Sequence, residues 1–143
     1  LFFREADARD VGVIVRVPLA SGLLSGKMSA STTFADDDPR MYNRKGDAFD
    51  VGETFAGLEL ETGLEAVEAE KELVPESATL AQMAIRWILM HPAVSTVIPG
   101  AKRPSQAIEN TRAAHMPPLD DDTMYAISDI YDRFARPEVH HRW

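Results

Sequence analysis

Two short apolar runs in this sequence predict buried β-strands. The first, Val11 to Val17, has valines at alternate positions on one side and an isoleucine on the other, which suits a strand covered on both faces. The second, Val94 to Ile98, has the length and β-branched content of a buried strand. Pro18 ends the first run, and Pro99 with Gly100 ends the second.

Apolar residues spaced three and four apart predict helices between and after these strands. The predicted helices cover residues 55–73, 79–91, 104–113 and 120–134. Thr79 and Gln82 form a T-x-x-Q capping box at the start of the second helix, and Asp120 is placed to cap the last. Residues 1–9 look like the middle of an amphipathic helix, so we expect the sequence to be a fragment of a longer protein.

Two strands cannot bury both faces or satisfy both edges of a sheet, so partner strands are required. A (β/α)₈ barrel needs about 250 residues, and the loops after its strands 7 and 8 frequently form a phosphate site. Here too, a glycine-containing loop follows each strand. The fold class predicted is therefore α/β: the C-terminal portion of a (β/α)₈ TIM barrel, with strands 7 and 8 and the surrounding helices, incomplete as given. Residues 1–143 would belong to a single barrel domain, with a long surface loop at about 28–52 whose acidic run, Asp36 to Asp38, faces solvent.

Composition narrows the classes of function. With 23 acidic and 15 basic residues the formal net charge is −8, which argues against a nucleic-acid partner. Cysteine is absent, which excludes disulfides and thiolate chemistry and favours a cytoplasmic location. No apolar run approaches the roughly 20 residues of a membrane span, so we expect no membrane partner.

The residues after the second strand have the parts of an anion site. Lys102 and Arg103 precede Pro104, which stands where a first helical residue belongs. The free N–H groups of the new helix, its positive dipole end and the two cations would converge on one phosphate. Taken alone, such a pair of cations in a loop more often simply faces water.

Three separated motifs resemble the aldo-keto reductase family. They read R-V-P-L-A-S-G-L-L-S-G-K at 16–27, T-L-A-Q-M-A-I-R-W-I-L at 79–89 and I-P-G-A-K-R-P-S-Q-A-I-E-N at 98–110. The resemblance covers nearly the whole chain and is strongest to bacterial members. It implies an NADP(H)-dependent oxidoreductase on a TIM barrel, which reduces aldehydes or ketones by hydride transfer.

The resemblance also implies which residues bind the cofactor. In the family, the loop after strand 7 runs beside the nicotinamide and the pyrophosphate, and the loop after strand 8 holds the adenosine end. The matching residues are Arg16, Pro18, Leu19, Ala20, Gly22, Leu24, Lys27, Gly100, Ala101, Lys102, Arg103, Gln106, Glu109 and Asn110. Lys102 and Arg103 would surround the 2′-phosphate, and Glu109 with Asn110 matches the pair that reads the adenine.

Two of these positions depart from the family pattern. Arg16 stands where relatives often place an aromatic residue that stacks on nicotinamide, although a planar guanidinium can also stack. Gln106 stands where many relatives have an arginine, so NAD(H) remains open beside NADP(H).

No catalytic residue is predicted within this sequence. The family's catalytic aspartate, tyrosine, lysine and histidine lie upstream of the matched motifs, and Tyr42, Tyr125 and Tyr131 match no catalytic position. No metal ligands are predicted either. We expect a small carbonyl substrate in the full-length protein, and a missing N-terminal half or a second chain to complete the barrel. The alternative is a non-catalytic nucleotide-binding or interaction module built on a half-barrel.

Overall fold

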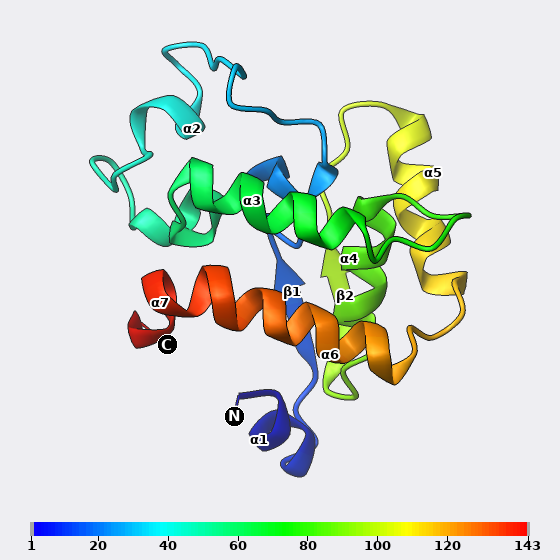
Figure 1. Ribbon diagram of the computed structural model, residues 1–143. Coiled ribbons are helices and arrows are strands. Elements are labelled where there is room, and N and C mark those ends of the chain that lie inside the picture. Colours follow the sequence, from blue (N-terminus) through cyan, green and yellow to red (C-terminus); the bar gives the residue numbers. More distant parts are fainter. Residues whose placement is uncertain (1, 143) are drawn as a thin grey trace.

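Two parallel strands and a layer of helices make up the computed structural model, which describes residues 2–142 (Figure 1). The helices and strands are α1 (Phe2–Ala8), β1 (Val13–Arg16), α2 (Pro39–Tyr42), α3 (Leu60–Lys71), α4 (Leu80–Leu89), β2 (Val94–Ile98), α5 (Pro104–Arg112), α6 (Asp121–Ile130) and α7 (Arg136–Val139). Short 3₁₀ turns are η1 (Ala20–Ser25), η2 (Val51–Glu53), η3 (Phe55–Gly57), η4 (Ala113–His115) and η6 (His140–Arg142), and a π-helical turn, η5 (Tyr131–Ala135), joins α6 to α7.

The two strands pair in parallel, as the sequence predicts. Val13 lies opposite Val94 and Arg16 opposite Ile98, with one irregularity after Val13. The observed β1 is shorter than the predicted strand. It stops at Arg16 because Val17 has a φ of 52°, in the left-handed region that a strand residue cannot occupy.

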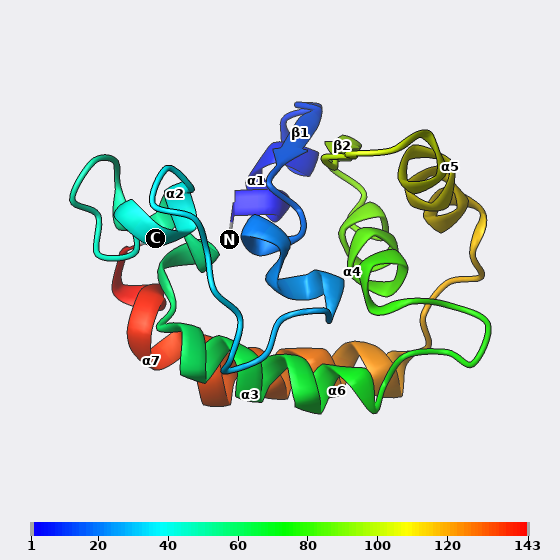
Figure 2. The ribbon, with the colours of Figure 1, turned by 90° about the horizontal axis from the view of Figure 1, so that it is seen from above.

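One face of this sheet is covered and the other is open. Figure 2 shows α3, α4 and α6 on one side of the strands, where Val15 and Val97 are half-buried. On the opposite face Ile14 is 62% exposed and Ile98 is 60% exposed. The prediction of a strand covered on both faces is therefore wrong for residues 2–142, because all the helices that could pack on it lie on one side.

The core joins the first strand's loop to the helices. Its buried members are Leu23, Phe55, Leu60, Val67, Leu80, Met83 and Leu119. Leu23 packs so closely on α3 that a Cβ atom added at Gly63 would lie 2.7 Å from Leu23 Cδ2. Within residues 2–142, none of the helices has the combination of length and apolar character that crossing a membrane requires.

Two predicted helix caps are confirmed. Thr79 Oγ1 accepts from Gln82 N at 3.2 Å, and Gln82 Oε1 accepts from Thr79 N at 3.0 Å, which completes the capping box of α4. Asp120 Oδ1 accepts from Thr123 N at 2.8 Å at the start of α6. The hydrogen bond from Thr123 lowers the pKa of Asp120, since it favours the charged carboxylate.

The long surface loop contains a helix that was not predicted. Asp38 caps α2 by accepting from Arg40 N at 2.9 Å, and Pro39 occupies the first helical position. The Arg40 guanidinium also donates to both Asp38 oxygens, at 2.9 and 2.6 Å, and this side-chain hydrogen bonding lowers the pKa of Asp38 to about 2. The expectation that the whole acidic run faces solvent is therefore wrong at Asp38, which is half-buried.

Candidate cofactor site

The two glycine-containing loops leave adjacent strands at the same end of the sheet. Arg16 and Ile98, the last residues of β1 and β2, are register partners. Because the strands are parallel, η1 and the segment 99–103 both begin at this edge, as Figure 1 shows. Carboxyl ends of neighbouring parallel strands are where α/β proteins place their ligands.

The loop after β1 is fixed by packing. Pro18 is buried, while the predicted residues Leu19, Ala20, Gly22 and Leu24 are half-buried. Ala20 and Leu24 pack against the core, so a ligand would meet the backbone of this loop more than those two side chains. Gly22 has a φ of 92°, which glycine adopts without strain, and Lys27 at the end of the loop is exposed.

The loop after β2 is open and positively charged. Gly100, Ala101, Lys102 and Arg103 are all exposed, and a Cβ atom at Gly100 would have no atom within 4 Å. Gln106 Oε1 accepts from Lys102 N at 2.7 Å and from Arg103 N at 3.1 Å. The two cationic side chains thus face solvent, and the backbone N–H groups of Lys102 and Arg103, which precede α5, are hydrogen-bonded to Gln106. The expectation of free N–H groups concerns the first turn of α5 itself and stays a prediction.

The other end of the predicted adenosine site lies on α5. Asn110 Nδ2 donates to Gly100 O at 3.3 Å and so braces the open loop. Gln82 Nε2 donates to Glu109 O at 3.1 Å, which ties α5 to α4 and leaves the Glu109 carboxylate exposed. In the part of the chain that the structure describes, no hydrogen bond or ion pair joins residues 100–110 to the loop after β1.

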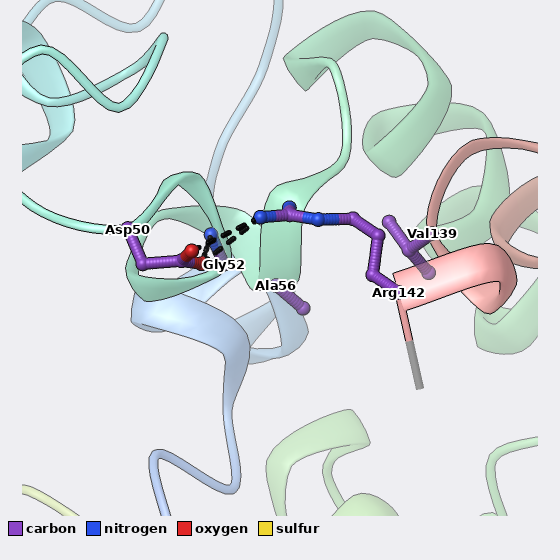
Figure 3. A pocket seen from close by; sticks show the side chains of 5 residues that line it. All are labelled: Asp50, Gly52, Ala56, Val139 and Arg142. Carbon is purple, nitrogen blue, oxygen red and sulfur yellow. Dashed lines mark hydrogen bonds and ion pairs between the residues drawn. The ribbon is translucent and has the colours of Figure 1, made fainter.

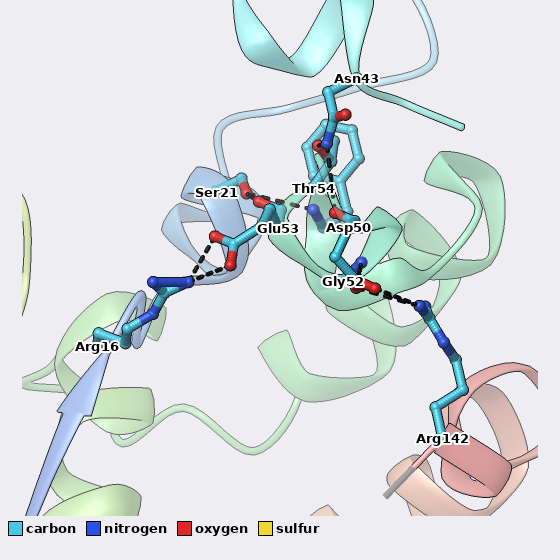
Figure 4. Close-up of polar contacts among 9 residues, drawn as sticks. Arg16, Ser21, Asn43, Asp50, Gly52, Glu53, Thr54 and Arg142 are labelled. Atoms are coloured by element: carbon cyan, nitrogen blue, oxygen red, sulfur yellow. Dashed lines mark hydrogen bonds and ion pairs between the residues drawn. The ribbon is translucent and has the colours of Figure 1, made fainter. Parts of the chain in front are cut away.

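Arg16 is held by a residue that the sequence did not point to. Its Nη2 donates to both carboxylate oxygens of Glu53 in η2 (Figure 4). The two residues lie 37 positions apart, and no periodicity or motif links them. The guanidinium of Arg16, which stands where relatives often have a stacking aromatic residue, is therefore fixed at the end of β1 by the long surface loop.

Arg40 is a second charged residue that the sequence analysis missed. Its Nη1 lies 3.8 Å from where a Cβ atom at Gly22 would be, so it lies beside the loop after β1. Its guanidinium also lies 4.6 Å from the centre of the Phe34 ring. The D-P-R sequence, which is typical of a helix start, is the signal that could have located it.

A family model for the aldo/keto reductase family matches residues 2–132. The chain belongs to the aldo/keto reductase family. Members of this family use nicotinamide cofactors and have an α/β fold of the TIM-barrel type.

Curated relatives of this aldo/keto reductase chain include proteins of two kinds. A probable voltage-gated potassium channel subunit beta of Arabidopsis thaliana is 36% identical over 111 residues, which cover 76% of this chain and 31% of that protein. An L-glyceraldehyde 3-phosphate reductase of Escherichia coli (strain K12) is 34% identical over 108 residues, covering 72% and 28%. The chain thus spans less than a third of the length of these relatives.

A solved structure shares the fold of this aldo/keto reductase chain. The glycerol dehydrogenase of Gluconobacter oxydans superposes with a TM-score of 0.73 at 25% sequence identity. The superposition covers 93% of this chain and 38% of the dehydrogenase.

The residues of the two loops fit a nicotinamide dinucleotide in charge and in hydrogen-bonding groups. Lys102 and Arg103 offer cations to a phosphate, and Gly100 leaves space beside them. Glu109 offers an exposed carboxylate that can accept from an adenine amino group. In this aldo/keto reductase chain the cations lie just before α5 and the acceptor lies in its last turn.

Proposed function

We propose that this chain is the C-terminal, cofactor-binding part of an NADP(H)-dependent aldo-keto reductase that reduces small aldehydes or ketones. The single observation that carries the proposal is the pair of loops at one edge of β1 and β2, one packed against the core and one open and cationic. When bound, the cofactor supplies the hydride. The residues of this chain bind and orient it.

Each loop has its own role in this proposal. Lys102 and Arg103 attract the 2′-phosphate, and Gln106 holds the backbone of both in place. Glu109 and Asn110 accept from the adenine. The backbone of the loop after β1, from Pro18 to Lys27, runs along the pyrophosphate and the nicotinamide. Since Gln106 replaces a charged arginine of many relatives, NAD(H) is the second cofactor to test.

The remainder of the barrel completes the enzyme in this proposal. Six further strands would pair with the open sheet edges and cover the face that carries Ile14 and Ile98. They would also bring the catalytic aspartate, tyrosine, lysine and histidine, the tyrosine giving a proton to the substrate oxygen. On its own, the chain would then hold part of a cofactor site and have no carbonyl reductase activity.

Replacing Lys102 tests the cofactor assignment. In the complete gene product, Lys102→Glu is expected to raise the Kd for NADPH about tenfold or more while changing the Kd for NADH by less than about twofold, because one charge-assisted contact to the 2′-phosphate is lost. Fluorescence titration of both cofactors measures this. Lys45→Glu, the same charge change at an exposed loop residue, is the control. Equal weakening of both cofactors by Lys102→Glu would contradict the assignment.

The second candidate function is a non-catalytic nucleotide-binding or interaction module. The observation that favours it is the open sheet face, which a second copy or another protein could also cover. One relative is described as a channel subunit, which supports considering a binding role. The two candidates differ in what lies against Ile14, and this difference can be measured.

A further inference from the structure

The 3₁₀ turn η2 and its cap join two distant parts of the chain. At its end, the Glu53 carboxylate accepts two hydrogen bonds from Arg16 Nη2. At its start, the Asp50 carboxylate accepts from Arg142 Nη2 at 3.1 and 3.2 Å (Figures 3 and 4). Asp50 Oδ1 also accepts from Gly52 N at 2.8 Å, which fixes the turn between the two carboxylates. We refer to residues 50–53 as the clasp.

The clasp is hydrogen-bonded directly to the loop after β1. Ser21 Oγ donates to Glu53 O at 3.1 Å and accepts from Phe55 N at 3.2 Å. Ser21 therefore bridges the backbone on both sides of Thr54. These two hydrogen bonds tie the backbone of Glu53 and Phe55 to the loop predicted to lie beside the nicotinamide.

Unusual backbone conformations lie on both sides of this contact. Ala20 and Ser21 have φ values of 45° and 57°, and Phe55 and Ala56 have values of 50° and 58°. Non-glycine residues persist in this region only where their surroundings hold them, and they gather at functional sites. Here the fully buried Phe55 side chain supplies part of that restraint.

The C-terminal turn contacts the clasp at Asp50, through Arg142. Arg142 passes so close to Gly57 that a Cβ atom there would lie 3.0 Å from its Nη1. Glu138 accepts from Glu59 N at 3.0 Å and from Thr62 Oγ1 at 2.7 Å, at the start of α3. Figure 3 shows Arg142 pointing toward Asp50. Both residues line a pocket of about 120 Å³.

We propose that Glu53 is a positioning residue for Arg16, and that Arg142, through Asp50, helps to hold Glu53 in place beside the loop after β1 at the nicotinamide end of the cofactor. The inference rests on the proposed function. Glu53 engages Nη2 alone, and within residues 2–142 the Nε and Nη1 donors of Arg16 have no protein partner. A guanidinium held in this way keeps its plane and its remaining donors ready for a ligand, so less side-chain entropy is lost on binding.

Glu53→Gln in the complete gene product is the direct test. It is expected to speed NADPH dissociation about fivefold and to shift the fluorescence of bound NADPH toward that of the free cofactor. The effect is modest because the Arg16 and Glu53 side chains are 65% and 45% exposed, which screens the pair. Stopped-flow fluorescence measures the rate. Glu76→Gln, at an exposed turn, is the matched control.

A double-mutant cycle separates positioning from general support of the fold. If Glu53 acts through Arg16, Glu53→Gln adds nothing to the dissociation rate of an Arg16→Leu protein. Arg142→Gln and Asp50→Asn are each expected to speed dissociation about twofold, with no effect once Glu53→Gln is present. If Glu53→Gln prevents folding, Arg142→Gln carries the same test.

The outcomes that overturn this inference are distinct from failure of the proposed function. The inference is overturned if Glu53→Gln leaves the dissociation rate unchanged, or if the effects of Arg16→Leu and Glu53→Gln are additive. Slower dissociation would also overturn it, because the ion pair would then compete with the cofactor. If the parent protein binds NADPH through Lys102 but the clasp variants behave like the parent, the inference alone fails. If the parent does not bind NADPH, both fail.

Discussion

Among single residues, Glu70 links the stability of the fold to pH. Burial near the end of α3 raises the pKa of this carboxyl to about 7. The folded state therefore keeps a proton that the unfolded state, with a glutamate pKa of about 4.3, has released. Because the folded state binds more protons in this window, the contribution of Glu70 to stability is highest below about pH 4 and falls as the pH rises to about 7.

Glu70→Gln is expected to remove this loss of stability at rising pH. At pH 8 the variant should be more stable than the parent by on the order of 2 kcal/mol, and at pH 4 the difference should nearly vanish. Urea unfolding at the two pH values measures the free energies of unfolding. Glu65→Gln, on the exposed side of α3, should change stability little at either pH. A constant gain at both pH values would show that burial of the charge is not the cause.

At the scale of structural elements, the segment from Asn43 to Thr54 is organised by one buried amide. Asn43 is fully buried, and its Oδ1 accepts from Ala48 N at 3.0 Å and Phe49 N at 2.6 Å. Its Nδ2 donates to Thr54 Oγ1 at 3.2 Å. A loop closed in this way is compact although it has little regular structure.

Asn43→Ala is expected to loosen this loop selectively. Two backbone N–H groups would lose their acceptor, which should lower the free energy of unfolding by about 2 kcal/mol and expose residues 43–54 to protease. Thermal unfolding and limited proteolysis with mapped cleavage sites measure the two effects. Met41→Ala, at an exposed neighbouring position, is the control. If both variants are cut equally fast, the Asn43 hydrogen bonds do not hold the loop.

The elements that could be predicted from the sequence are those whose cause is local. The capping box of α4 depends on Thr79 and Gln82, three residues apart, and β2 on the β-branched content of five consecutive residues. The helix α2 was missed even though Asp38 and Pro39 carried a local signal. For these elements the sequence contains the physical reason within one turn or strand.

Contacts between distant segments could not be predicted in this way. Glu53 meets Arg16 only because the long loop folds back over the end of β1. Gln106 is recognisable as a departure from its relatives, but its role as acceptor for two backbone amides depends on the conformation at residues 102–103. The left-handed φ of Val17, which shortens β1, likewise could not be predicted, because a β-branched residue is typical of a strand.

At the scale of the whole molecule, the open sheet face decides between the two candidate functions. In a complete (β/α)₈ barrel, residues on this face point into a packed interior filled by side chains. In a self-contained module the same residues face solvent or a second copy. Ile14 and Arg16 alternate with the half-buried Val15, so both lie on the face away from α4.

Ile14→Lys in the complete gene product distinguishes a barrel interior from a module in which this face meets solvent. If the rest of a barrel encloses this residue, the variant buries an unpaired charge, and the free energy of unfolding should fall by about 3 kcal/mol or more. If Ile14 remains 62% exposed, the change should stay within about 0.5 kcal/mol. Thermal and urea unfolding measure it, with Tyr125→Lys, at a 76% exposed site on α6, as the control. Equal, small changes in both variants would contradict the barrel proposal and favour the module, because a lysine can be accommodated on this face only where water reaches it.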